Sequence, residues 1–312
     1  MPRLASAPVT WGVWEKTYGR NGLMEPQAML AAVRDLGFTG IELGPRGYFG
    51  ADAAEVAATF AGAELALVGA FVELPLYDEE QFRRDWAELE WTIPVLAQTA
   101  EAGQGCVVLA DAGSPERYAS AGRLDEIARL RPSADATARA LERLDEVGRR
   151  CAESGVRLAF HHHAGTQVET MEEIRLVLDG TDPDVVGFCV DSGHAHIGGV
   201  DPCDLLDLCA GRINLLHLKD VDDAVLARLR ATELDLEGAW ASGLFCECPT
   251  GGARTEAFLA HPAVGEFDGW LVFEQDRLDA GPDDVEPIRA VEARHLELVS
   301  RVLGSSGVQA PR

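Results

Sequence analysis

Residues 156–163 read Val-Arg-Leu-Ala-Phe-His-His-His, a short apolar run that ends in three histidines. Nearly continuous hydrophobicity of this kind is typical of a strand covered on both faces in a parallel sheet. Because side chains alternate along a strand, His161 and His163 share one face and His162 points to the other. The segment predicts a buried strand that presents two imidazoles at its carboxyl end, with His162 packed outward in a structural role.

Seven further short apolar runs complete the pattern, at 4–9, 40–43, 66–73, 105–110, 185–190, 213–218 and 270–274. Amphipathic stretches separate them, such as 26–36, which opens with proline and is followed by glycine. Alternating strands and helices indicate an α/β fold, and eight strands close a TIM barrel. We predict one (β/α)₈ barrel over residues 1–304, followed by a flexible tail at 305–312. The irregular region 220–265 is too long for a simple crossover and is expected to carry an extra substrate loop.

Groups that bind metals or move protons stand at the ends of six expected strands. A barrel gathers these ends on one face, which favours it over an open doubly wound sheet. Carboxylates and imidazoles together suit a borderline divalent ion such as Mn²⁺, Co²⁺, Fe²⁺ or Zn²⁺. For two of these residues a purely structural role stays open. Glu42 could serve merely as an ion-pair partner of Arg46, and Lys219 could be a solvent-exposed partner of Asp220. The groups are Glu42, Glu73, His161 with His163, Asp191 with His194, His217 with Lys219, and Glu274 with Asp276.

The composition limits the kinds of binding partner and the cellular compartment that we expect for this protein. The formal charge is −25, from 52 acidic and 27 basic side chains, which disfavours nucleic acid and anionic membranes as partners. The seven cysteines form no disulfide or zinc pattern, which fits a reducing cytoplasm. The N-terminal sequence lacks the pattern of a signal peptide, and no apolar run is long enough to span a bilayer. We expect a cytoplasmic protein that binds a small molecule; whether it forms homo-oligomers stays open.

Five motifs carry a family resemblance. They are GIELGPRGYFG at 40–50, FHHHAGTQVETMEEI at 160–174, VGFCVDSGHAHIGGVDP at 186–202, INLLHLKDVD at 213–222 and DGWLVFEQD at 268–276. Together they resemble the inosose dehydratase family, a branch of the xylose-isomerase-like TIM-barrel sugar isomerases and epimerases. The resemblance implies metal ligands at Asp191, His217 and Glu274, with His161 where the superfamily usually has glutamate. Segment 245–252 departs from the Gly-rich loop expected there, which bears on the substrate.

The same resemblance implies dehydration of 2-keto-myo-inositol with a divalent metal, Mn²⁺ or Co²⁺ first and Zn²⁺, Fe²⁺ or Mg²⁺ as alternatives. A metal ion would stabilise the enolate formed when an α-proton leaves, while a base and an acid move protons. The candidates for proton transfer are His163, Lys219 and Glu73. The expected substrate contacts are His194, Glu42, Trp11 and Tyr48.

Other functions use the same first step. A ketose isomerase or 3-epimerase and a 3-keto-glycoside lyase also begin by removing an α-proton from a ketose-like substrate. Paired glutamates serve the epimerases, so histidine at position 161 favours the dehydratase. A non-catalytic sugar-binding barrel is disfavoured by the intact set of ligand candidates, and a DNA-repair endonuclease of this superfamily is disfavoured by the acidic charge.

Overall fold

The computed structural model describes residues 1–278 and 280–304, apart from the side chain of Pro282, so the tail expected at 305–312 lies outside the described residues. The main sheet is parallel, in the order β3-β2-β1-β11-β8-β7-β6-β5-β4. Its strands are β1 (Arg3–Ser6), β2 (Gly40–Ile41), β3 (Ala66–Leu67), β4 (Gly69–Leu74), β5 (Cys106–Asp111), β6 (Arg157–His161), β7 (Val186–Asp191), β8 (Ile213–Leu218) and β11 (Trp270–Phe273).

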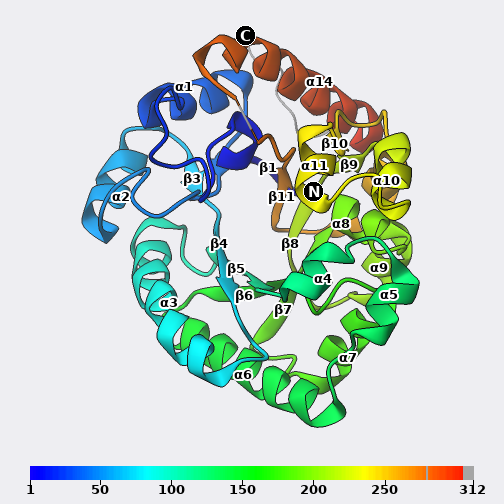
Figure 1. Cartoon of the computed structure of the whole chain (residues 1–312). Helices are drawn as coiled ribbons and strands as arrows, with labels where there is room; N and C mark the ends of the chain where they lie inside the picture. The colour runs from blue at the N-terminus through cyan, green and yellow to red at the C-terminus, as the bar shows by residue number, and fades with distance from the viewer. Residues whose placement is uncertain (279, 305–312) are drawn as a thin grey trace.

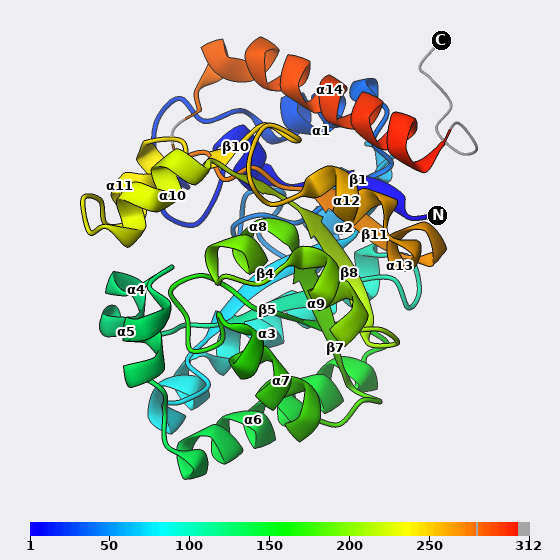
Figure 2. The same cartoon turned by 90° about the vertical axis from the view of Figure 1, so that its right-hand side faces the viewer.

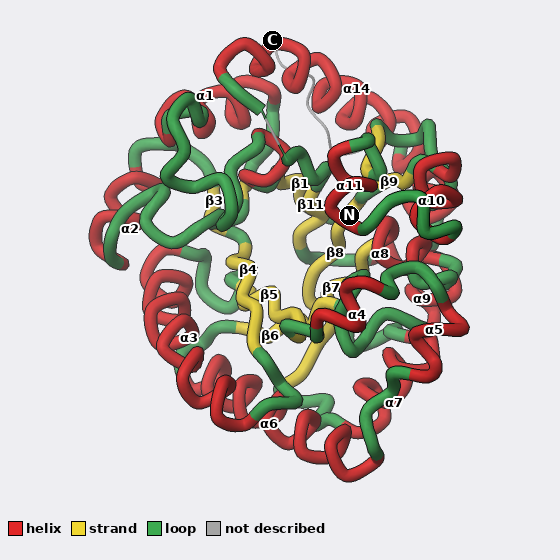
Figure 3. The backbone as a smooth tube through the Cα atoms, in the orientation of Figure 1, coloured by secondary structure: helices red, strands yellow, loops and turns green. Residues whose placement is uncertain are grey.

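One interrupted strand closes this sheet into a barrel. Only Val68 separates β3 from β4, so the two edges of the sheet belong to one continuous run. The first half of that run pairs with β2 and the second half with β5. The eight expected strands are therefore all present, and the closed arrangement around a central axis is visible in Figure 3. The predicted TIM barrel is confirmed.

Helices surround the barrel (Figure 1). The amphipathic stretch expected at 26–36 forms the helix α1. The helices are α1 (Pro26–Leu36), α2 (Ala53–Ala61), α3 (Glu79–Thr99), α4 (Pro115–Ala119), α5 (Leu124–Arg129), α6 (Ala134–Glu153), α7 (Met171–Gly180), α8 (Ser192–Ile197), α9 (Pro202–Leu208), α10 (Asp223–Arg230), α11 (Leu236–Ala241), α12 (Thr255–Ala260), α13 (Pro262–Glu266) and α14 (Val285–Leu303). Within the described part of the chain, no helix is both long and apolar enough to cross a membrane.

Region 220–265 folds into a substantial excursion instead of a loop. It contains α10 to α13 and a small antiparallel pair of β9 (Asp220–Val221) with β10 (Phe245–Cys246). A separate apolar cluster, which includes Ala121, Ile197, Leu226 and Leu236, joins this excursion to the chain before α5 and to α8. In Figure 2, α4, α5, α10 and α11 lie together on the side opposite the N-terminus, toward which the barrel strands run. They form the rim of the barrel mouth.

Candidate active site

A cavity of about 610 Å³ opens at the carboxyl ends of the strands. Residues from the first, second, third, fifth, seventh and eighth barrel strands, or from the segments directly after them, line it. Its ionisable lining includes Glu42, Glu73, His161, His163, Lys219, Glu274 and Asp276, all predicted from their positions at strand ends. In TIM barrels this face carries the active site, because it collects loops from every strand.

Four side chains at the bottom of the cavity form a cluster suited to a metal ion. His161, Asp191, His217 and Glu274 each offer a ligand atom, and these atoms lie within 4.8 Å of one another. The Asp191 carboxylate oxygen Oδ2 is 3.5 Å from His161 Nε2 and 3.6 Å from His217 Nδ1. Glu274 Oε2 is 2.6 Å from the same Nδ1. The structure thus brings together the four residues that the family resemblance implied as ligands.

The hydrogen bonds of the cluster leave the converging atoms free for a ligand. Asp191 Oδ2 and His217 Nδ1 are buried and make no hydrogen bond to the described residues; Glu274 Oε2 makes none either, but the Lys219 ammonium lies 3.2 Å from it. The other carboxylate oxygen of Asp191 accepts a hydrogen bond from the His194 amide at the start of α8. Orphaned buried acceptors are costly unless something binds them. Two imidazole nitrogens and two carboxylate oxygens therefore fit a divalent ion.

Neighbouring groups determine which ring nitrogen each of the two proposed ligand histidines, His161 and His217, turns toward the cluster. The His161 Nδ1 group donates to the carbonyl oxygen of His162 at 2.7 Å, which turns the Nε2 lone pair toward Asp191. In His217, Nε2 lies 3.2 Å from Glu42 Oε1, so its proton is donated there and Nδ1 faces the cluster. Carboxylate or carbonyl partners commonly orient metal-binding histidines in this way. Glu42 thus contacts a proposed ligand, while Arg46 pairs with Glu88 instead.

Burial disfavours the charged forms of Asp191 and His217, and neighbouring groups of opposite charge favour them. For Asp191 burial alone would raise the pKa, but the charge of Lys219 and the nearby histidines hold it well below its usual value. For His217 burial alone would lower the pKa, but Cys189, Glu274 and Glu42 raise it well above its usual value. Two carboxylates and two imidazoles are thus held close together in a buried place, where a divalent cation would balance the negative charge.

Lys219 is a buried part of the site and not an exposed partner of Asp220. Its ammonium lies 2.8 Å from Asp276 Oδ1, 3.2 Å from Glu274 Oε2 and 3.3 Å from His194 Nε2. These carboxylates raise the pKa of Lys219 in spite of burial. Asp220 instead accepts hydrogen bonds from the amides of Val221, Gly251 and Ala253 and shapes the 245–252 segment.

The other two histidines of the 161–163 run behave as their alternating directions predict. His163 faces the cavity, and its Nδ1 group donates to the carbonyl oxygen of Ala164 at 2.9 Å, leaving the Nε2 lone pair available. Burial and the neighbouring His161 lower the pKa of His163 to about 3. His162 is fully buried on the other face, where its Nε2 accepts the Asp191 amide at 3.3 Å. His162 thus braces a proposed ligand from behind.

Three expected substrate contacts lie outside the cavity lining. Trp11 is buried beneath the first strand, where its indole donates to the Ser6 hydroxyl at 3.1 Å. The hydroxyl of Tyr48 donates to the Met24 carbonyl at 2.5 Å in a cluster of aromatic rings. His194 is fully buried behind His163, with ring centroids 3.7 Å apart, so it supports a cavity residue from below. The structure thus places Trp11 and Tyr48 among packed side chains, which is the more common role of aromatic rings near strand ends.

Asp111, which directly follows the fourth apolar run, was missed by the sequence reasoning. It is buried and accepts hydrogen bonds from the amides of Leu76, Gly113 and Gln167, at 3.1, 2.8 and 3.2 Å. Burial raises its pKa to about 6, although these three amides favour the charged form. The carboxylate ties together the loops after three adjacent strands. Its position one residue beyond an apolar run was the signal that could have identified it.

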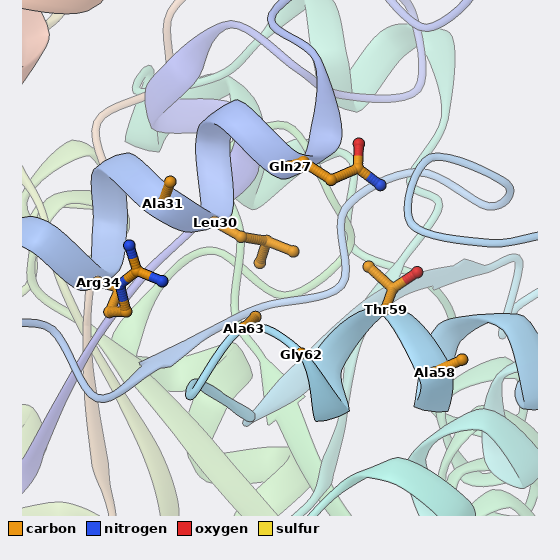
Figure 4. A pocket seen from close by; sticks show the side chains of 8 residues that line it. All are labelled: Gln27, Leu30, Ala31, Arg34, Ala58, Thr59, Gly62 and Ala63. Atoms are coloured by element: carbon orange, nitrogen blue, oxygen red, sulfur yellow. The ribbon is translucent and has the colours of Figure 1, made fainter.

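A second hollow on the surface, between α1 and α2, lacks this chemistry (Figure 4). Its lining consists of Gln27, Leu30, Ala31, Arg34, Ala58, Thr59, Gly62 and Ala63. Its one cation, Arg34, pairs with the adjacent Asp35. The barrel mouth is therefore the better candidate for an active site.

The fold and the cluster define a class: a TIM-barrel enzyme whose strand ends gather imidazoles and carboxylates suited to a metal ion. The Xylose isomerase-like TIM barrel family model matches residues 30–292, and the chain belongs to this family. It is 28% identical to the inosose dehydratase of Geobacillus kaustophilus (strain HTA426), across 88% of this chain and 87% of the relative. It is 31% identical to the rhizopine catabolism protein MocC of Rhizobium meliloti, across 98% of this chain and 90% of that protein.

A solved structure supports the same fold. The IOLI protein with a binding zinc atom superposes with a TM-score of 0.68 at 16% identity, covering 96% of this chain and 99% of that one. The resemblance to inosose dehydratases inferred from the five motifs is thus confirmed.

Proposed function

We propose that the protein is a metal-dependent dehydratase that removes water from a cyclic polyhydroxylated ketone, with 2-keto-myo-inositol (scyllo-inosose) as the substrate to test first. One observation carries the proposal: four donor atoms converge beside a cavity lined by His161 and Glu274 of that group and by His163 and Lys219. The relationship to inosose dehydratases supports the same reaction.

The proposed metal site consists of His161, Asp191, His217 and Glu274. A divalent ion bound there, with Mn²⁺ or Co²⁺ the first candidates, would act as a Lewis acid toward the ketone oxygen of the substrate. The protein's own contribution is to orient the donors, since the His162 carbonyl and Glu42 fix the two imidazoles. The mixed nitrogen and oxygen donors support this choice over a purely oxygen-liganded ion.

The proposed base is His163. Its Nδ1 proton is engaged by a backbone carbonyl, so Nε2 is the nitrogen able to take the α-proton from the carbon beside the ketone. The electron pair of that C–H bond forms the enolate and then the new double bond, as the C–O bond to the β-hydroxyl breaks. The hydroxyl needs one proton to leave as water.

Two groups are placed to supply that proton. Lys219 carries an ammonium held by Asp276 on the seventh-strand side of the cavity. Glu73 extends from the third barrel strand, opposite the seventh in a closed ring of eight. Burial, then the nearby Asp111 and Glu15, raise the pKa of Glu73, which favours the protonated form of an acid catalyst. We rank Lys219 first because it lies closer to the proposed metal ligands.

The test is a product assay on the Mn²⁺- or Co²⁺-loaded enzyme with scyllo-inosose, following the ultraviolet absorbance of the conjugated, enolised dione. A signal that chelator and His163→Ala abolish supports the dehydratase. A matched control is His196→Ala, because His196 lies on α8, pairs with Asp223 at the start of α10 and does not line the cavity. Absence of dione from scyllo-inosose with metal bound, together with turnover of a ketohexose or a 3-keto-glycoside, would replace the dehydratase with one of the alternative functions. We also propose a cytoplasmic location, since all seven cysteines are free.

A further inference from the structure

We propose that the cavity contains a second subsite, formed by Trp14, Tyr118 and Trp240, which binds a second hydroxylated ring carried by the substrate. The substrate is then a polyol ketone joined through an ether or glycosidic oxygen to another ring. This inference rests on the proposed function for the reacting ring and adds the class of its substituent.

The three aromatic residues come from separate excursions at the barrel mouth. Trp14 follows the first strand, Tyr118 lies on α4 and Trp240 lies on α11, and all three line the same cavity as the metal cluster. The Trp240 ring meets the other two edge to face, with centroids 6.2 Å from Trp14 and 6.4 Å from Tyr118. Figure 2 shows α4 and α11 on the same side of the barrel. Chain segments distant in sequence thus build one aromatic wall.

Phe245 connects this wall to the reacting centre. Its ring lies 6.3 Å from the Trp240 ring and 5.4 Å from the His194 ring, and the Lys219 ammonium lies 4.7 Å from its centroid. Only the Phe245 ring therefore separates the wall from His194 and from Lys219, the proposed acid for the departing hydroxyl. A substituent attached near the reacting carbons would extend along it.

The size of the cavity favours an occupant larger than a single six-membered ring. About 610 Å³ is in the range of pockets that enclose drug-sized ligands, and it is several times the volume of an inositol ring. Aromatic faces bind the apolar C–H faces of a ring while its hydroxyls remain available for polar contacts. Two linked rings would therefore use the cavity more fully than one.

The polar groups at the wall identify the chemistry of the second ring. The Lys16 ammonium lies 5.4 Å from the Trp14 ring and 5.8 Å from the Tyr118 ring, and Lys16 lines the cavity. A cation at this position would repel an ammonium substituent and can donate to hydroxyl oxygens. The indole nitrogens of Trp14 and Trp240 and the Tyr118 hydroxyl are buried and make no hydrogen bond to the described residues. These features favour a neutral polyhydroxylated ring over a charged or purely apolar one.

The experiment compares two stable polyols on the Mn²⁺-loaded enzyme by titration calorimetry: myo-inositol and galactinol, its galactoside. Neither has a ketone, so neither is turned over. We expect galactinol to bind about fivefold more tightly, since ring packing on an aromatic face contributes about 1 kcal/mol, which is about fivefold in Kd. Trp240→Ala should remove this preference and Trp240→Phe should keep most of it. Trp86→Ala, on the outer helix α3, is the matched control and should leave the preference intact.

Equal affinities in the parent enzyme, no binding of either polyol, or a preference that persists in Trp240→Ala would each overturn the subsite. The proposed function fails on a different result, namely the absence of dione from scyllo-inosose with metal bound. A galactinol preference that depends on Trp240 would support the subsite even then.

Discussion

The proposed metal cluster (His161, Asp191, His217 and Glu274) and the aromatic wall (Trp14, Tyr118 and Trp240) share one cavity but are built in different ways. The cluster stands on β6, β7, β8 and the end of β11, adjacent strands whose register fixes the spacing of the ligands. The wall stands on short helices and a loop outside the sheet. Barrels commonly keep the chemistry on the strands and vary the substrate through the loops. The difference suggests that the reaction and the specificity of this protein can be altered separately.

The supports of the two regions differ as well. The cluster is braced by single contacts from neighbouring strands, such as His162 on the Asp191 amide. The wall depends on buried carboxylates that tie loops to each other. Glu173 binds Arg117, the residue before Tyr118, with oxygen–nitrogen distances of 2.6 and 3.0 Å. Glu169 accepts the amides of Gly122 and Gly165, at 2.7 and 2.8 Å.

The largest expected effect is the removal of charge from the metal cluster. Asp191→Asn keeps the shape but removes the charged oxygen that faces both proposed histidine ligands. We expect kcat/KM to fall by about a thousandfold or more and Mn²⁺ affinity by more than about a hundredfold, since a ligand contributes more than the groups that orient it. Steady-state kinetics and metal titration measure the two effects. Asp204→Asn, on the exposed side of α9, is the control, and near-normal metal binding in Asp191→Asn would contradict the assigned site.

Next in size is the support of the aromatic wall. Arg117→Met leaves the buried Glu173 carboxylate without its partner, which typically costs about 3–5 kcal/mol. Urea unfolding should show this loss, and Arg117→Met with Glu173→Gln should recover part of it, because the buried charge is then gone. The exposed pair of Arg34 and Asp35 gives the comparison, and Arg34→Met should change the free energy of unfolding far less than Arg117→Met. A similar small loss in Arg117→Met would mean that the wall does not depend on this ion pair.

The sequence was most informative where backbone geometry determines the direction in which a side chain points. Alternation along β6 correctly placed His161 and His163 on one face and His162 on the other, and the strand ends correctly placed Lys219 and Glu73 at the cavity. Each of these deductions needed only the two-residue period of a strand and the closure of the barrel.

Contacts made outside the sheet were not predictable from the sequence. Trp240 reaches the cavity through α11, whose position depends on an apolar cluster shared by chain segments more than a hundred residues apart. The partners of Glu42 and Lys219 were equally unpredictable. Their neighbours in the sequence, Arg46 and Asp220, were the obvious candidates, but the folded chain pairs Glu42 with His217 and Lys219 with Asp276. The packed positions of Trp11 and Tyr48 were unpredictable for the same reason, since nothing in the local sequence distinguishes an aromatic residue in the core from one at a pocket.

A smaller effect, of about 3 kcal/mol at most, concerns the pH dependence of the support of the wall. Burial raises the pKa of Glu169 to about 7 from a usual value of 4.5, in spite of its two amide hydrogen bonds. A carboxyl whose pKa is raised by folding stabilises most below pH 4.5 and loses that contribution as pH rises to about 7. Glu169→Gln should therefore show a flatter decline in the free energy of unfolding between pH 5 and 7.5. Parallel curves for variant and parent, measured by urea unfolding, would refute the shift.

The smallest expected effect lies where the two regions meet, at Asp276. Its carboxylate holds the Lys219 ammonium at 2.8 Å, while Glu274, a proposed metal ligand, lies 3.2 Å from the same nitrogen. In Asp276→Asn the ammonium should shift toward Glu274 and compete with the metal for that carboxylate. Partners that orient a metal site usually contribute about 10- to 100-fold, so we expect kcat and Mn²⁺ affinity to fall within this range.

The exposed Asp268→Asn is the matched control for Asp276→Asn and should leave both quantities unchanged. If kcat falls in Asp276→Asn while Mn²⁺ affinity is unchanged, Asp276 acts on Lys219 alone, and the ammonium is the group that assists departure of the hydroxyl. If both fall together, the carboxylate protects the metal site from Lys219, and Glu73 becomes the stronger candidate for the acid. The result would show how far the chemistry on the strands depends on the groups beside it.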